Sequence, residues 1–224
     1  MTAAFERLAA GAAALGVSLQ PGQLDRLLEY LGLIAKWNRV YNLTAVRDPD
    51  EMLTQHLLDS LAVLPALARE WPGAGRLLDV GSGAGLPGVV IALVRPDLQV
   101  DCVDTVGKKA AFIQQAAVQL QLANLRGVHN RVEHLAGEYD IVTSRAFASL
   151  ADFVALSSGV LQPAGIWMAM KGRLPSDEIA ALPSETDVFH VEQLSVPDLA
   201  AERCLVWMRR KVLAGAGSGG TAEA

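Results

Sequence analysis

The residues with the clearest chemical potential are four glycines between two apolar runs. They stand at positions 81, 83, 85 and 88, after the strand-like run 76–80 and before the helical run 89–94. Glycine allows positive φ and lets a ligand approach the main chain without meeting a Cβ, and the first amides of a helix offer free donors. Because one tight turn does not need four glycines, this loop predicts a site for a nucleotide-like cofactor.

Two overlapping patterns in this loop point to different cofactors. The stretch 83–88 satisfies the dinucleotide fingerprint GxGxxG, with Asp104 about 20 residues further on. The stretch 81–85, with Asp79 two residues before it, instead resembles the first motif of S-adenosylmethionine-dependent methyltransferases. A carboxylate at position 79 would repel a pyrophosphate but suits a cofactor with an amino group and a sulfonium. S-adenosylmethionine is therefore favoured over a dinucleotide.

Further candidate residues follow the other predicted strands, where ligands of open α/β sheets bind. Asp104 ends the second strand and could accept hydrogen bonds from ribose hydroxyls, or could cap the helix predicted from residue 107. Val132 and Glu133 follow the third strand and could meet an adenine edge, although Glu133 could equally be an exposed acid at a helix start.

Arg145 follows the fourth strand, where methyltransferases usually place substrate chemistry. Its guanidinium could hold the cofactor carboxylate, an RNA phosphate or a guanine edge, or could pair with Asp140 or Asp152. No Asn-Pro-Pro-Tyr-like tetrapeptide and no nucleophilic cysteine stands beside it. Lys171 and Arg173 add positive charge after the fifth strand.

The elements that must position these residues form an α/β pattern preceded by a helical segment. Leucines at helical spacing predict about three helices before residue 70, the third capped by Asp48. Beyond them, two runs at 187–196 and 203–210 predict a closing antiparallel hairpin. Strands are predicted near 76–80, 99–104, 125–129, 139–144 and 166–171, and helices near 86–94, 107–122, 149–161 and 175–182.

This order predicts a class I methyltransferase (Rossmann-like) fold with a mostly parallel seven-stranded sheet. We expect an N-terminal helical cap over 1–72, a cofactor-binding domain over 73–212 and a disordered tail over 213–224.

Composition narrows the functional class. A net charge of −5 disfavours a protein that coats DNA, although a local basic patch remains compatible with structured RNA. Cys102 and Cys204 lie in apolar runs and predict buried, reduced thiols, and the four histidines do not form a metal set. Without a signal peptide or membrane span, we expect a cytoplasmic monomer that binds neither membrane nor DNA.

Five motifs together resemble the RsmG (GidB) family, the bacterial 16S ribosomal RNA guanine-N7 methyltransferases. The motifs are Tyr-Asn-Leu-Thr at 41–44, His-Leu-Leu-Asp-Ser at 56–60, the glycine stretch 79–88, Ser-Arg-Ala at 144–146 and Met-Lys-Gly at 170–172. The resemblance runs over roughly residues 20 to 210. It implies a guanine in the decoding-region loop of 16S ribosomal RNA, free or in the small subunit, as the substrate.

The resemblance also implies site residues. It places Gly81, Leu86, Val132, Glu133 and Arg145 at S-adenosylmethionine, to which the loop pattern adds Gly83 and the strand ends add Asp104.

For RNA, the candidates are Asn42, His56, Lys171 and Arg173, and we expect Asn42, His56 and Asp59 to brace the cap or shape the RNA entrance. Guanine N7 carries a lone pair and no hydrogen, so no general base is expected and Arg145 takes a positioning role. A small-molecule methyltransferase and a non-catalytic nucleotide-binding regulator remain the alternatives.

Overall fold

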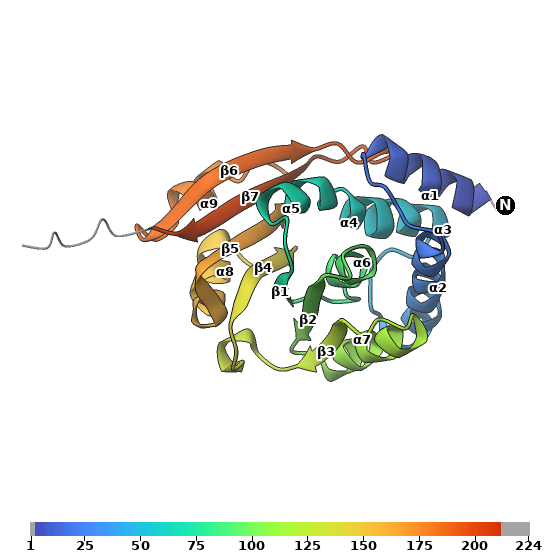
Figure 1. Cartoon of the computed structure of the whole chain (residues 1–224), viewed down its shortest axis with the longest axis horizontal. Coiled ribbons are helices and arrows are strands. Elements are labelled where there is room, and N and C mark those ends of the chain that lie inside the picture. Colours follow the sequence, from blue (N-terminus) through green and yellow to red (C-terminus); the bar gives the residue numbers. More distant parts are fainter. Residues whose placement is uncertain (1–2, 212–224) are drawn as a thin grey trace, which may run out of the picture.

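A computed structural model describes residues 3–211, which form one seven-stranded sheet flanked by helices (Figure 1). The strand order is β3-β2-β1-β4-β5-β7-β6. All strands run in the same direction except β7, which is antiparallel to β5 and β6. The predicted mostly parallel sheet with a closing hairpin is therefore confirmed, while the predicted tail lies outside the described residues. The strands are β1 (Gly75–Val80), β2 (Leu98–Asp104), β3 (Leu125–His129), β4 (Tyr139–Arg145), β5 (Leu161–Lys171), β6 (Thr186–Leu194) and β7 (Arg203–Arg210).

Helices cover both faces of the sheet, so the central strands are apolar on both sides. In β1, Leu77 belongs to one core and Leu78 to the other, and both side chains are fully buried. The helices α6 (Gly88–Val94) and α7 (Gly107–Gln119) pack on the first face, and α8 (Leu150–Ser157) packs on the second, next to the short α9 (Ser176–Ala180).

The N-terminal segment is helical, as predicted, but its third helix differs from the prediction. Asp48 caps it as expected, its Oδ1 accepting from the amides of Asp50 and Glu51 at 3.0 Å each. The run is then α-helical, π-helical and α-helical in turn, and a separate helix follows after residue 63. A π-helical turn inside a helix is frequently found at functional sites. The helices are α1 (Ala3–Ala14), α2 (Gln23–Tyr41), α3 (Pro49–Met52), η1 (Leu53–Leu58), α4 (Asp59–Leu61) and α5 (Leu64–Glu70).

The helical cap packs on the first face of the sheet and shares the core on that face. The buried Tyr30 of α2 donates its hydroxyl to the carbonyls of Ala84 and Gly85 at 2.6 and 3.2 Å, so α2 rests directly on the glycine loop. Apolar residues of α1, α2, η1, α5, α6 and α7 belong to one contiguous buried cluster. The cap therefore holds the loop in place.

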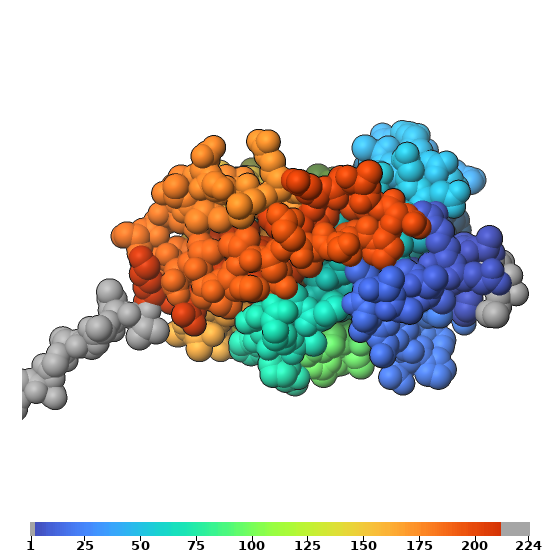
Figure 2. All heavy atoms as spheres, turned by 90° about the horizontal axis from the view of Figure 1, so that it is seen from above, coloured from blue at the N-terminus to red at the C-terminus, as the bar shows by residue number. Residues whose placement is uncertain are grey.

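The first helix and the turn of the closing hairpin also meet. The β6–β7 hairpin extends along α5 and reaches α1 at the far end of the molecule (Figures 1 and 2). There Arg7 pairs with Asp198 between the two strands at 3.0 Å and with Asp50 at 3.2 Å. The hairpin thus closes against the cap.

One boundary prediction was wrong. The helix expected over 149–161 is α-helical to residue 157 and continues as the 3-10 helix η3 (Ser158–Val160), and β5 begins at Leu161, five residues before the predicted start. The register shifts between the pairs Tyr139↔Leu161 and Ile141↔Ile166. Pro163 and Gly165 fall within this irregularity, which explains how a strand tolerates residues that usually break one.

Candidate active site

The glycine loop is bonded to the end of β2. The amides of Gly81 and Ser82 donate to the Val103 carbonyl at 2.9 and 3.2 Å, and the Gly83 amide donates to Asp104 Oδ2 at 3.0 Å. At Gly83, where φ is +59°, a Cβ would meet no atom within 4 Å. At Gly85, with φ +87°, a Cβ would collide with Val89. Gly85 therefore serves the packing of the loop, whereas Gly83 leaves space open beside it.

Asp79 lies beneath the loop rather than facing a ligand. The side chain is fully buried, and Oδ2 accepts from the Gly88 amide at 2.8 Å, while Oδ1 has no partner in the part of the chain that the structure describes. Burial raises the pKa of Asp79 to about 7. The prediction that this carboxylate faces the cofactor is corrected, because Asp79 braces the first turn of α6 and lines no cavity described below.

Two cavities open at the carboxyl ends of the strands and share Gly81. Their volumes are about 520 and 260 Å³. Of the residues predicted for the cofactor, the larger is lined by Gly81, Gly83, Leu86 and Arg145. The smaller is lined by Gly81, Asp104, Val132 and Glu133. The structure thus brings every predicted cofactor residue to one continuous edge of the sheet.

Asp104 is held rigidly in the smaller cavity. Its Oδ2 accepts from the Gly83 amide, its Oδ1 accepts from the Val106 amide at 2.8 Å, and Lys109 Nζ lies 3.7 Å from Oδ2. The carboxylate therefore joins the glycine loop to the turn before α7, whose N-cap residue is Val106, and its contact with ribose hydroxyls stays a prediction. Glu133 is exposed in the short 3-10 helix Val132–His134.

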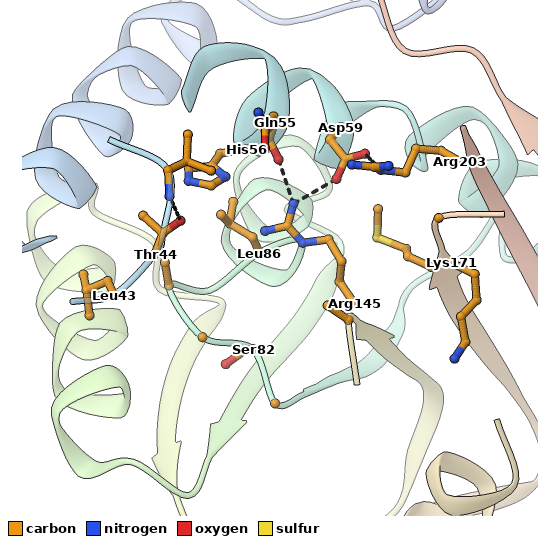
Figure 3. A pocket seen from close by; sticks show the side chains of 17 residues that line it. Leu43, Thr44, Gln55, His56, Asp59, Ser82, Leu86, Arg145, Lys171 and Arg203 are labelled. Atoms are coloured by element: carbon orange, nitrogen blue, oxygen red, sulfur yellow. Dashed lines mark hydrogen bonds and ion pairs between the residues drawn. The ribbon is translucent and has the colours of Figure 1, made fainter. Parts of the chain in front are cut away.

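Arg145 belongs to an ion-pair network that joins three parts of the chain (Figure 3). Its Nη1 donates to Asp59 Oδ2 at 2.9 Å and to the Gln55 carbonyl at 2.8 Å. Arg203 donates from Nε to the other oxygen of Asp59 at 2.8 Å. The alternative of a pair with Asp140 or Asp152 is wrong, since Asp140 accepts from the Arg76 amide and Asp152 from Ser149. Asp59 thus ties the cap to the ends of β4 and β7.

His56 stands one turn before Asp59 in the π-helical segment, in the wall of the larger cavity (Figure 3). The residue is only 3% exposed, and within residues 3–211 neither ring nitrogen has a hydrogen-bond partner of good geometry. Burial and then the positive charge of Arg145 lower the pKa of His56 to about 4. The imidazole is therefore neutral at pH 7.

The residues predicted for RNA fall at different places. Lys171 lines the larger cavity and binds Glu178 at 2.7 Å, and Arg173 lines the adjoining groove of about 890 Å³ together with Lys171 and Arg203. Asn42 lies outside the cavity in a left-handed conformation that ends α2, where its Oδ1 accepts from Arg47 at 3.2 Å. The cavity brings His56 and Lys171 together but not Asn42 or Arg173.

Sequence reasoning missed Arg203, Gln55 and Thr44, which also line the larger cavity. Arg203 is the first residue of β7, and its neighbour Cys204 pairs with Lys171 at the end of β5. The predicted hairpin contained the signal, a basic residue opening its second strand. This basic residue could be assigned to the cavity only by knowing that β7 lies beside β5.

The remaining features that the sequence raised are the cysteines, a metal site and a membrane span. Cys102 and Cys204 are free and buried, as predicted. Between residues 3 and 211, no three His, Cys, Asp or Glu side chains gather into a group that could hold a metal ion. None of the helices in this range is both long and apolar enough to cross a membrane.

Sequence comparison assigns the family. The family model GidB, described as rRNA small subunit methyltransferase G, matches residues 23–206. The chain belongs to this family. Two similar relatives carry the name ribosomal RNA small subunit methyltransferase G. The protein of Paracidovorax citrulli (strain AAC00-1) is 61% identical, covering 95% of this chain and 93% of its own. That of Acidovorax sp. (strain JS42) is 62% identical over 89% and 92%. The resemblance from the five motifs is confirmed.

Solved structures agree on the fold. Coclaurine N-methyltransferase bound to N-methylheliamine and SAH has a TM-score of 0.57 at 9% identity, covering 92% of this chain and 93% of its own. TrmN from Thermus thermophilus has a TM-score of 0.55 at 19% identity, covering 68% and 49%. At these identities the likeness concerns the fold alone, and it confirms the class I methyltransferase architecture of this family member.

Proposed function

We propose that the protein transfers the methyl group of S-adenosylmethionine to N7 of a guanine in the decoding-region loop of 16S ribosomal RNA. The observation that carries this proposal is the pair of cavities joined at Gly81, in a chain that belongs to the rRNA small subunit methyltransferase G family. One cavity suits the nucleoside half of the cofactor. The other has room for its amino-acid half and a base beside it.

The residues present fit S-adenosylmethionine. In the smaller cavity, the two amides bound to Asp104 fix a carboxylate where ribose hydroxyls can donate to it, and Val132 offers a buried apolar wall for adenine. In the larger cavity, the open space at Gly83 admits a ligand against the main chain. When bound, the cofactor supplies an electrophilic methyl group on a sulfonium.

The protein's own residues then have to position the guanine and exclude water. Guanine N7 carries a lone pair and no proton, so the geometry needs no general base. Asp59 and the Gln55 carbonyl bind Nη1 of Arg145 and so fix the guanidinium in the wall of the larger cavity, which suits the positioning role proposed for it.

Three basic side chains stand at the rim. Lys171 and Arg203 line the larger cavity, and both continue with Arg173 into the adjoining groove, which Asp177, Glu178 and Glu202 also line. A base in a folded RNA loop has to leave its stack to reach a buried site, and phosphates on either side of it would then pass this rim. We therefore assign Lys171 and Arg173 to phosphate contacts.

The deciding experiment incubates the protein with radiolabelled S-adenosylmethionine and small ribosomal subunits from cells that lack the modification. Chemical cleavage at N7-methylguanine then maps the label, and we expect one guanine in the decoding region. Label at another atom or on no RNA would contradict the proposed substrate. Binding of NADH tighter than of S-adenosylhomocysteine would instead favour a non-catalytic nucleotide-binding regulator.

A glycine variant tests the cofactor assignment separately. Gly83→Ala adds a methyl group to the open space of the larger cavity, and Gly22→Ala is its matched control, because both glycines have positive φ and open surroundings. Each should lose about 1–2 kcal/mol of stability from the left-handed strain. Only Gly83→Ala should bind S-adenosylhomocysteine more weakly in calorimetry. Equal affinity of the two variants would place the cofactor elsewhere.

A further inference from the structure

An exposed apolar surface lies where α2 ends and α7 begins. Within residues 3–211, Val40, Tyr41 and Val106 are 70%, 41% and 44% exposed, which is unusual for large apolar side chains. Lys108 Nζ lies 5.4 Å from the centre of the Tyr41 ring and so joins the two helices here. We call Val40, Tyr41, Val106 and Lys108 the Tyr41 patch.

The basic residues of this surface are free to bind a ligand. Lys36, Arg39 and Lys108 are exposed, and none forms an ion pair with any side chain of the described range. On α2, Lys36, Arg39 and Val40 follow one another at helical spacing and therefore share a face, and Tyr41 at the end of the helix lies on a different face. In a chain of net charge −5, this is a local basic surface. Its unpaired charges fit a polyanion.

The Tyr41 patch adjoins both cavities. Leu43 and Thr44 line the larger cavity, and they follow Tyr41 by two and three residues. Because consecutive Cα atoms are about 3.8 Å apart, Tyr41 lies within roughly 8 Å of Leu43 along the chain. Val106 itself lines the smaller cavity. A strand with one base in the larger cavity would therefore pass over this surface within a nucleotide or two.

We propose that the Tyr41 patch is a docking platform for single-stranded RNA next to the target guanine, a role that rests on the proposed function. A neighbouring base stacks on the Tyr41 ring, which already packs against Trp37 at 5.2 Å between ring centres, with the two planes tilted by 40°, and so is held in place. Lys108, a flexible exposed side chain, moves from the ring to a phosphate. Lys36 and Arg39 bind further phosphates of the same strand. Three apolar side chains are too few for a stable protein interface, which needs about 800 Å² per partner.

The experiment compares Tyr41→Ala with Tyr41→Phe, which keeps the ring, and with Val118→Ala, which removes an exposed apolar side chain near the other end of α7. Methylation of small subunits is measured at varied subunit concentration, and affinity for S-adenosylhomocysteine by calorimetry. We expect Tyr41→Ala to raise KM for the subunit about tenfold with kcat and cofactor affinity unchanged. Tyr41→Phe and Val118→Ala should match the natural protein.

The basic residues are tested by the salt dependence of RNA binding. Replacing Lys36, Arg39 and Lys108 together by alanine should reduce the slope of log affinity against log salt by about 2, because each lost contact to single-stranded RNA removes about 0.7. An unchanged KM for Tyr41→Ala, or weaker cofactor binding by it, would overturn the proposal. So would a photoreactive phenylalanine at position 41 that crosslinks to a ribosomal protein and not to RNA. If the natural protein methylates no subunit at all, the proposed function fails instead.

Discussion

Replacing Asp59 by asparagine should destabilise the protein more than any surface ion pair could. Asp59 is 1% exposed and accepts from two guanidinium groups, Arg145 at 2.9 Å and Arg203 at 2.8 Å. The asparagine keeps the shape of the side chain but removes the negative charge. Two arginine side chains that are about four-fifths buried then face each other without a counter-ion.

The expected cost follows from the burial of these groups. Breaking a buried ion pair by removing one partner costs about 3–5 kcal/mol. Arg145 and Arg203 remain 22% and 23% exposed, so water can solvate them in part and the lower end, about 3 kcal/mol, applies. For a chain of this size each kcal/mol lowers Tm by about 2–4 °C, which gives a fall of roughly 6–12 °C.

Urea unfolding at pH 7 and calorimetry measure both quantities. The control is Asp198→Asn, because Asp198 pairs with Arg7 at 3.0 Å but is 57% exposed, and such a pair contributes at most about 1 kcal/mol. Asp59→Asn should also unfold with an unchanged dependence on urea, since the same surface is exposed. A loss no greater than that of Asp198→Asn would refute the conclusion that Asp59 anchors the cap.

Three further predictions concern packing and pH. Gly88→Ala should lower the free energy of unfolding, measured in urea, by about 1–3 kcal/mol, because its Cβ would overlap Cys102 and lie 2.8 Å from Asp79 Oδ2. An unchanged free energy of unfolding would mean that the loop relaxes freely. The raised pKa of Asp79 means that the folded state holds a proton which the unfolded state releases above pH 4. The stability of the natural protein relative to Asp79→Asn should therefore fall from about pH 4 to about pH 7, by about 1.4 kcal/mol per pH unit, and level off above; a flat difference would contradict it. For His56 the sign is opposite, because its lowered pKa of about 4 makes protonation favour the unfolded state. Relative to His56→Gln, the natural protein should lose stability as pH falls from 6.5 to 4, and pH-independent behaviour in the same assay would show that the ring is not desolvated.

The sequence was sufficient to predict which residues gather at the carboxyl ends of the strands. Gly81, Asp104, Glu133 and Arg145 each follow an apolar run, and parallel strands end at the same edge of a sheet, so their shared location follows from strand positions alone. The helix start at Pro49 could also be predicted from local sequence, because the four residues Asp48 to Glu51 supply a capping aspartate, a proline and two acids of the first turn. The alternation of strands and helices determined the class of fold in the same way.

Only the tertiary structure decided which charges meet and which are buried. Asp59 and Arg203 are far apart in sequence, and their pairing depends on β7 inserting beside β5 and on the cap docking over β4. Asp79 looked like a ligand group until the packing of α6 buried it against Gly88. Strand order and desolvation arise from contacts between distant segments, and no local pattern of residues encodes them.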